Sequence, residues 1–265
     1  MSELPLAGKT VLVTRAKEQA PALSALIQKQ GGTALEVPLL AFQRSKQEDQ
    51  IDQALKHIAD YDWLIFTSVN GVHFFMERYN EMYKNDSTPP VKIAVVGEKT
   101  EAALLNYNIK TDVMPLDYSA EGMVDVLVNH IHAGDKVLLA RGNLGRNVLN
   151  VALAKIGAHL DDLTLYKTVY PGEAKSELHH LIENRIPVDY VTFTSSSTVS
   201  HYVNIMNQFD RENAHFKPKI ACIGPIAAKT AADLGLTVDI IPLTYTIEEL
   251  VEQLVIDTKK EENAV

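Results

Sequence analysis

The sequence DYVTFTSSSTVSHYV, residues 189–203, contains the local pattern around which the chain is organised. Its first part is rich in β-branched and aromatic residues, which predicts a strand over 190–193. After the hydroxyl residues at 194–197, apolar residues return at helical spacing over 199–206. The hydroxyls can cap the first amides of that helix, and the same amides attract anions. The stretch therefore predicts a strand, a polar turn and a helix.

This pattern occurs twice in the chain. The stretch DWLIFTSVNGVHFF at 62–75 has a Phe-Thr-Ser core at 66–68 that matches 193–195, an offset of 127 positions. At the same offset, 91–128 and 218–255 share twelve identities in 38 positions, where about two or three are expected by chance. The sequence therefore contains an internal repeat.

The beginning of the chain belongs to the repeat as well. The sequence KTVLVTR at 9–15 resembles DKVLLAR at 135–141, at an offset of 126. In both copies, predicted strands alternate with helices of about ten residues, which is typical of parallel sheets with helices on both faces. We therefore predict an α/β fold with two similar parallel-sheet lobes.

Composition limits the classes of partner and cofactor. The 25 Lys and Arg against 34 Asp and Glu give a net charge of −9, which argues against a nucleic-acid or anionic-membrane partner. Cys222 is the only cysteine, so no disulfide within the chain is possible. The sequence shows no signal-peptide pattern and no long apolar run, so we expect a cytoplasmic protein without a membrane span. The nine histidines lack metal-ligand spacing, and GxGxxG and Walker patterns are absent, so neither a metal site nor a nucleotide site is expected.

Six stretches together carry a resemblance to a known family. They are VLVTR at 11–15, DWLIFTSVNGV at 62–72, IAVVGEKT at 93–100, LYKT at 165–168, VTFTSSSTV at 191–199 and IACIGPIAA at 220–228. Each motif is weak by itself, but their order and spacing are specific. Together they resemble the uroporphyrinogen-III synthase family over nearly the whole chain.

The resemblance implies a division into two flavodoxin-like lobes joined by a two-stranded connector. Residues 1–38 would combine with 170–265 in one discontinuous lobe, and 44–164 would form the other. The connecting segments would be 36–44 and 163–170.

The resemblance also implies a reaction in tetrapyrrole (haem) biosynthesis. A lyase of this kind cyclises hydroxymethylbilane, a linear tetrapyrrole, to uroporphyrinogen III with inversion of ring D and loss of water, without a cofactor. Loss of the hydroxymethyl oxygen gives an azafulvene, and attack by the terminal ring gives a spiro intermediate that fragments and recloses. Such chemistry needs proton transfer to the leaving hydroxyl and a firm hold on the substrate. We expect a monomer that acts on this small-molecule substrate.

Tyr166 is the predicted catalytic residue, because it matches the family's tyrosine in the connector motif LYKT. A phenol can protonate or hydrogen-bond the departing hydroxyl, an effect on the order of a hundredfold in rate. The alternative is a strand tyrosine that only packs at the connector.

Residues where strands end and helices begin are predicted to bind the eight carboxylates of the substrate, because ligands of open α/β sheets lie beyond the carboxyl ends of the strands. We expect both hydroxyl clusters to face a common cleft. The predicted residues are Thr67, Ser68, Gly97, Thr100, Thr194, Ser195, Ser196, Ser197 and Gly224. Simple N-capping is the alternative for each hydroxyl.

Two cations complete the predicted binding set. Arg15 follows the first strand, and its guanidinium suits a carboxylate. Lys219 matches a basic residue of the family, although a solvated lysine would also explain it. Asn70 stands where some relatives carry arginine, which removes one expected cation.

Two other functions remain open at this point. One is a non-enzymatic bilobal α/β protein that closes on a small molecule by hinge motion, and the other is a flavodoxin-like regulatory module. Both need only the fold, whereas Tyr166 and the spacing of the family motifs favour catalysis.

Overall fold

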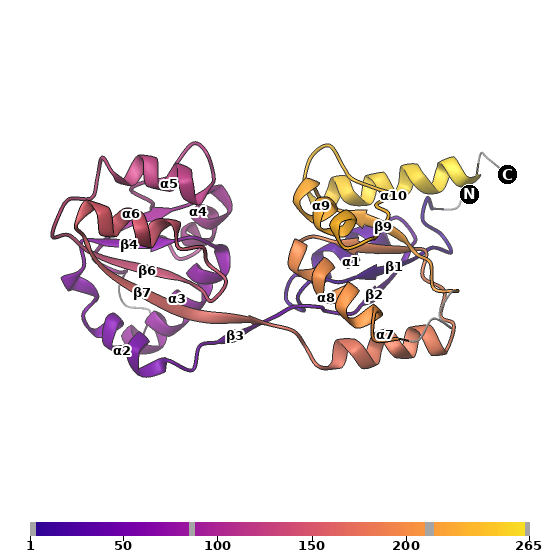
Figure 1. Cartoon of the computed structure of the whole chain (residues 1–265), viewed down its shortest axis with the longest axis horizontal. Coiled ribbons are helices and arrows are strands. Elements are labelled where there is room, and N and C mark those ends of the chain that lie inside the picture. The colour runs from indigo at the N-terminus through magenta and orange to yellow at the C-terminus, as the bar shows by residue number, and fades with distance from the viewer. Residues whose placement is uncertain (1–3, 85–87, 210–214, 263–265) are drawn as a thin grey trace. The chain divides into compact units, whose positions relative to one another are not determined.

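The chain folds into two compact units, seen in a computed structural model that describes residues 4–84, 88–209 and 215–262 (Figure 1). Unit 1 consists of Met1–Ala41 and Val169–Val265, and unit 2 consists of Phe42–Thr168. Unit 1 is therefore discontinuous in sequence. Together with the parallel sheets described below, this confirms the predicted fold class.

Unit 1 is built on a four-stranded sheet with the order β2-β1-β8-β9, in which all three pairings are parallel. Its elements are β1 (Thr10–Val13), α1 (Ala20–Lys29), β2 (Thr33–Glu36), α7 (Glu173–Glu183), β8 (Tyr190–Phe193), α8 (Ser196–Met206), β9 (Lys219–Cys222), α9 (Pro225–Asp233) and α10 (Ile247–Glu262).

Unit 2 is built on a five-stranded sheet with the order β3-β7-β6-β4-β5. Its elements are β3 (Ala41–Arg44), α2 (Glu48–Lys56), the short 3-10 helix η1 (Ile58–Asp60), β4 (Trp63–Phe66), α3 (Val69–Tyr83), β5 (Lys92–Val95), α4 (Glu98–Leu105), α5 (Ala120–Leu127), β6 (Lys136–Gly142), α6 (Val148–Ile156) and β7 (His159–Val169). The chain passes between the units in β3 and at the end of β7, which are neighbouring strands of this sheet.

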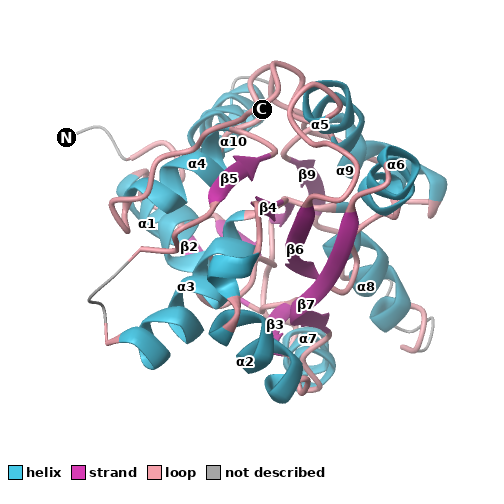
Figure 2. Ribbon diagram, turned by 90° about the vertical axis from the view of Figure 1, so that its left-hand side faces the viewer, coloured by secondary structure: helices cyan, strands magenta, loops and turns pink. Residues whose placement is uncertain are grey.

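Helices cover both faces of the sheet of unit 2, because alternate residues of a strand point to opposite faces. Leu64 and Phe66 of β4 belong to an apolar cluster with α2, α3 and α4. Trp63 and Ile65 of the same strand belong to a second cluster with α5 and α6. Figure 2 shows α2 and α3 on one side of these strands and α5 and α6 on the other.

Unit 1 repeats this arrangement. Val191 and Phe193 of β8 pack with α7, α8 and α9, whereas Tyr190 packs with α1 and α10. The registers repeat as well: Trp63 lies opposite Lys92 in unit 2, and Tyr190 lies opposite Lys219 in unit 1. The internal repeat seen in the sequence is thus a repeat of packing and register.

A polar contact at the start of a buried strand is also duplicated. In unit 2, a carboxylate oxygen of Asp112 accepts the Ile93 N–H at 2.8 Å. In unit 1, Asp239 accepts the Ile220 N–H at 2.7 Å. These carboxylates satisfy backbone donors where β5 and β9 begin, so the repeat preserves hydrogen bonds as well as apolar packing.

We predict that Asp239→Ala lowers the free energy of unfolding by about 1 to 3 kcal/mol, because the Ile220 N–H loses its acceptor. Urea unfolding followed by circular dichroism measures the loss. Asp233→Ala is the control, since Asp233 is an exposed residue at the end of α9 and should change stability little. Equal stability of the two variants would contradict this role for Asp239.

Candidate functional site

The carboxyl end of β4 leads into a capped helix in unit 2. Thr67 and Ser68 follow the strand and are partly exposed. Ser68 is the N-cap of α3, and its Oγ accepts the Gly71 N–H at 3.0 Å. The first amides of a helix have no partner within the helix, so this turn offers donors for an anion.

Tyr166 of β7 lies against the same turn. Its Oη is 3.1 Å from Ser68 Oγ. Its ring stacks on Phe74 with centroids 5.1 Å apart, and the edge of Phe42 lies 5.7 Å away. The structure therefore brings together Ser68 and Tyr166, two predicted site residues, and holds the tyrosine ring between aromatic side chains.

Gly97 and Thr100 lie at the start of α4, beyond the carboxyl end of β5. A Cβ on Gly97 would lie 3.3 Å from the ring of Tyr118, so the glycine leaves room for that side chain. Thr100 donates its N–H to the Gly97 carbonyl at 2.9 Å, and only 6% of the residue is exposed. Gly97 thus marks the helix start, and Thr100 is buried to nearly the same degree as Tyr166, of which 7% is exposed.

The carboxyl end of β8 carries the second hydroxyl cluster, in unit 1. Ser195 is the N-cap of α8, and its Oγ accepts the Thr198 N–H at 3.3 Å. The same Oγ lies 3.0 Å from Ser197 Oγ. Thr194 and Ser196 are partly exposed, and Ser196 is the first residue of the helix. The cluster therefore combines the predicted cap with exposed hydroxyls.

Gly224 starts α9 in unit 1 as Gly97 starts α4 in unit 2. A Cβ on Gly224 would lie 3.2 Å from the ring of Tyr245. The next residue is Pro225, which has no N–H, so this helix offers one amide fewer at its start than α8 does.

Arg15 stands just beyond the carboxyl end of β1, the strand that pairs with β8. One terminal nitrogen donates to Gln19 Oε1 at 3.3 Å. Its Nε is buried and has no hydrogen-bond partner among the described residues. Burial lowers the pKa of Arg15, while the carboxylate of Glu248 opposes that shift. A buried donor without a partner is costly, so Arg15 is suited to bind an anion.

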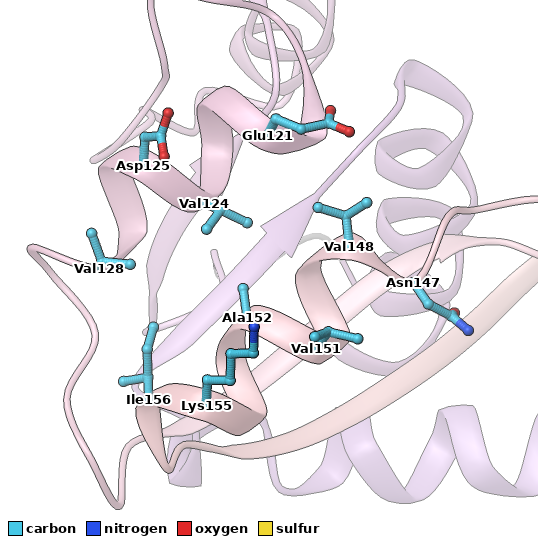
Figure 3. Close-up of a pocket in the computed structure, with 10 residues that line it drawn as sticks. All are labelled: Glu121, Val124, Asp125, Val128, Asn147, Val148, Val151, Ala152, Lys155 and Ile156. Carbon is cyan, nitrogen blue, oxygen red and sulfur yellow. The ribbon is translucent and has the colours of Figure 1, made fainter.

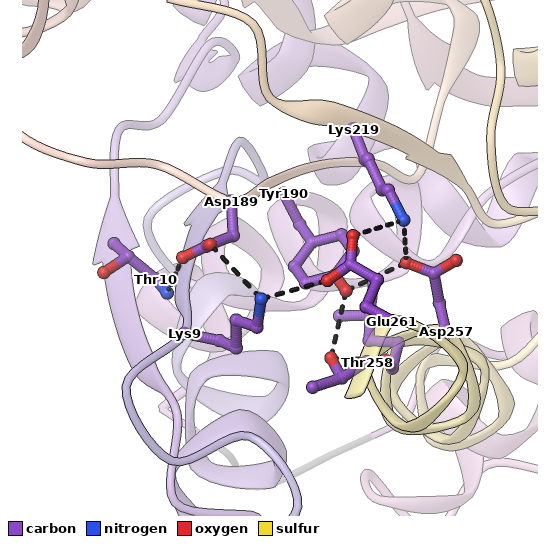
Figure 4. Close-up of polar contacts among 9 residues, drawn as sticks. Lys9, Thr10, Asp189, Tyr190, Lys219, Asp257, Thr258 and Glu261 are labelled. Atoms are coloured by element: carbon purple, nitrogen blue, oxygen red, sulfur yellow. Dashed lines mark hydrogen bonds and ion pairs between the residues drawn. The ribbon is translucent and has the colours of Figure 1, made fainter. Parts of the chain in front are cut away.

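Lys219 is the first residue of β9, so it lies at the amino ends of the strands of unit 1, whereas the hydroxyl cluster lies beyond their carboxyl ends. Its Nζ is 2.6 Å from Asp257 and 2.8 Å from Glu261, both on α10 (Figure 4). Burial opposes its charge, but hydrogen bonds to these carboxylates outweigh that effect and raise the pKa of Lys219. Lys9 pairs with Glu261 at 3.0 Å. The structure therefore separates Lys219 from the hydroxyl cluster and joins it to the C-terminal helix.

A groove of about 780 Å³ runs between α5 and α6 on the surface of unit 2 (Figure 3). Apolar residues form most of its lining, together with Glu121, Asp125, Asn147 and Lys155, and Val128 and Val151 are about half exposed. Among the described residues that form the lining, none is a predicted site residue. The groove is therefore distinct from the place where Ser68, at the start of α3, meets Tyr166 of β7.

The part of the chain that the structure describes contains neither a cluster of metal-ligating side chains nor a helix that could span a membrane. Across 4–84, 88–209 and 215–262, no group of three or more His, Cys, Asp or Glu side chains is placed to hold a metal ion. Within the same ranges, every helix is too short or too polar to span a bilayer.

Comparison with known proteins identifies the family. The model of the family described as uroporphyrinogen-III synthase HemD matches residues 21–252. The chain belongs to the uroporphyrinogen-III synthase family. It is 32% identical to the uroporphyrinogen-III synthase of Synechococcus elongatus, over 94% of this chain and 96% of that protein. It is 24% identical to the uroporphyrinogen-III synthase of Escherichia coli K12, over 85% of this chain and 92% of that one.

Solved structures of uroporphyrinogen III synthases show the same fold. A mutant of the Thermus thermophilus protein covers 96% of this chain with a TM-score of 0.65 and 18% identity, and all of that chain is aligned. The Helicobacter pylori protein covers 94% of this chain and 99% of its own, with a TM-score of 0.58 and 18% identity. At these identities the likeness concerns the fold alone.

We predict a pH-dependent contribution of Glu261 to stability. Hydrogen bonds from Lys219 and Lys9 lower the pKa of Glu261 below its ordinary value of 4.5. Its contribution is therefore present above pH 4.5 and lost as the pH falls through the lower folded value. Glu261→Gln should lower the melting temperature at pH 7, and the difference from wild type should shrink as the pH falls below 4.5.

Thermal unfolding between about pH 2 and pH 7 tests this prediction. Glu177→Gln is the control, since Glu177 is an exposed residue of α7. A Glu261→Gln effect that stays constant across this range would contradict the assignment.

Proposed function

We propose that the chain cyclises hydroxymethylbilane to uroporphyrinogen III, with loss of water and inversion of ring D. The observation that carries this proposal is the family match over residues 21–252, supported by relatives named uroporphyrinogen-III synthase that align over nearly the whole chain. That the protein works as a cytoplasmic monomer is part of the same proposal.

Tyr166 is the proton donor in this proposal. Its phenol proton passes to the hydroxymethyl oxygen, the carbon–oxygen bond breaks, and water leaves with the bonding electron pair. The terminal ring then attacks the azafulvene carbon through its substituted carbon and gives a spiro intermediate. The bond from that carbon to its original methylene bridge breaks, and the methylene recloses on the unsubstituted carbon of the same ring, which inverts ring D. A proton is released from that ring when the macrocycle closes, and it restores the phenol. The support for this role is the position of Tyr166 beside the N-terminus of α3, together with its fixed ring.

In this proposal, the substrate carboxylates bind beyond the carboxyl ends of the strands in both units. In unit 2 the donors are Thr67 and the first amides of α3. In unit 1 they are the hydroxyls and amides at 194–197 and the unpaired Nε of Arg15. Each exposed contact of a carboxylate with a helix N-terminus contributes about 0.3 to 1 kcal/mol, so many weak donors hold the substrate. Lys219 does not belong to these carboxylate donors, because it lies at the amino end of its strand.

Incubation with hydroxymethylbilane and separation of the isomeric products test the function. The proposal predicts uroporphyrinogen III as the main product, at a rate that depends on protein concentration. Formation of the uninverted isomer alone, at the rate seen without protein, would refute it.

We predict that Tyr166→Phe lowers kcat by roughly tenfold to a thousandfold with little change in KM, because only proton donation is lost. Phenylalanine keeps the stacking on Phe74 and the contact with Phe42. Steady-state kinetics with hydroxymethylbilane measure the change, and unfolding curves check that the variant is folded. Wild-type kcat in the variant would assign the rate to substrate positioning alone.

We predict that Ser196→Pro raises KM several-fold, whereas Ser196→Ala changes it by less than about twofold. Ser196 is the first residue of α8, a position where proline fits a helix, and Ser195 before it is extended with φ −156° and ψ 155°. Proline therefore removes one amide without disrupting the helix. Pro225 already occupies the same position of α9.

The control for this comparison is stability. Both variants should unfold within about 1 kcal/mol of the wild-type protein, since the helix start tolerates either residue. If Ser196→Pro is as stable as wild type and binds the substrate equally well, the amide at this helix start is not a carboxylate donor.

A further inference from the structure

The hydrogen bond between Ser68 and Tyr166 has a consequence for the reaction. We propose that Ser68 is a positioning residue: it donates its hydroxyl proton to Tyr166 Oη, so that the phenol proton remains available for the leaving hydroxyl of the substrate. Ser68 then acts through Tyr166 and does not itself bind a carboxylate. This inference rests on the proposed function, and it replaces the role of substrate ligand that the sequence predicts for Ser68.

The contacts of the Ser68 hydroxyl support this direction of donation. A serine hydroxyl has one proton to donate and can accept two. Its Oγ already accepts the Gly71 N–H at 3.0 Å, and its distance to Tyr166 Oη is 3.1 Å. Donors in series polarise one another, and the helix N-terminus favours negative charge on the oxygens beside it. The series therefore runs from the Gly71 N–H through the Ser68 hydroxyl to the phenol oxygen.

Gly142 makes room for the phenol in this position. A Cβ on Gly142 would lie 2.5 Å from Cζ, 2.6 Å from Cε2 and 2.8 Å from Oη of Tyr166. Gly142 is the register partner of Tyr166, just after an irregularity between Arg141 and Gly142. Any side chain at position 142 would push the ring away from Ser68. Gly142 is therefore a second positioning residue.

The other copy of the repeat supplies an internal comparison. Ser195 caps α8 as Ser68 caps α3. At the offset of 126, however, Tyr166 corresponds to Leu40 and Gly142 to Ala16, which are 7% and 2% exposed. Capping therefore needs neither a neighbouring phenol nor a glycine opposite it. The combination of serine, tyrosine and glycine is a specialisation of unit 2.

A double-mutant cycle on Ser68 and Tyr166 tests this inference, with kcat and KM measured on hydroxymethylbilane. Ser68→Ala should lower kcat by about tenfold and leave KM within about twofold. Ser68→Thr, which keeps the hydroxyl and the cap, should restore most of kcat. In the Tyr166→Phe background, Ser68→Ala should cause no further loss of kcat.

Ser119→Ala is the matched control for loss of a cap. Ser119 caps α5 in the same unit, and its Oγ accepts the Gly122 N–H at 2.9 Å. This variant should keep the wild-type kcat. An increase in KM for Ser68→Ala, or an equal loss of kcat with Phe at position 166, would show that Ser68 binds substrate and would overturn the inference. A wild-type protein that forms no uroporphyrinogen III would overturn the proposed function as well.

Gly142→Ala provides a second measurement, which does not depend on the hydroxyl of Ser68. The variant should lower both kcat and the melting temperature, because the added Cβ displaces the Tyr166 ring. Adding Tyr166→Leu recreates the alanine and leucine pair of unit 1, and should recover melting temperature without recovering activity. Gly172→Ala is the control, since no atom lies within 4 Å of a Cβ there. Wild-type kcat in Gly142→Ala would overturn the role of Gly142.

Discussion

The parallel pairing of β1 with β8 is the constraint on which unit 1 depends. Leu12 lies opposite Val191 in this register. Two buried hydrogen bonds reinforce it: Thr14 Oγ1 donates to the Thr192 carbonyl at 2.6 Å, and Thr192 Oγ1 donates to the Leu12 carbonyl at 3.0 Å. The free-energy cost of closing a loop rises by only about 0.6 kcal/mol for each doubling of the loop length. The chain between β1 and β8 can therefore contain the whole of unit 2. Because β1 and β8 are parallel, Arg15, which follows β1, lies at the same end of the sheet as the turn at Ser195.

Duplication explains much of the molecule, and divergence explains the candidate site. Both copies keep the register, the carboxylates at strand starts and the serine caps. They differ where Tyr166 and Gly142 of unit 2 correspond to Leu40 and Ala16 of unit 1. In the proposed function, chemistry is therefore assigned to one copy, while the helix starts of both copies would supply donors for carboxylates. A net charge of −9 is compatible with an anionic substrate because these donors are local.

The sequence predicted the fold, because strand alternation and the repeat are local or periodic signals. It placed helix starts at the hydroxyl turns 67–68 and 194–197 without choosing Ser68 or Ser195 as the cap. It did not reveal the contact between Ser68 and Tyr166, which are 98 positions apart and meet only through the sheet order. The need for glycine at 142 was hidden for the same reason. Lys219 was expected in the binding set from its family position. Its place at the start of a strand was the available signal against this role, since ligands of such sheets lie beyond the carboxyl ends of the strands.

A structure of the protein with uroporphyrinogen III bound tests the central claim most directly. We expect product carboxylates at the N-termini of α3 and α8 and beside Arg15, with Tyr166 Oη against the macrocycle. Ser68 should be hydrogen-bonded to Tyr166 and to the Gly71 N–H but not to the product. Product seated in the groove between α5 and α6, or product that leaves Tyr166 without contact, would contradict it.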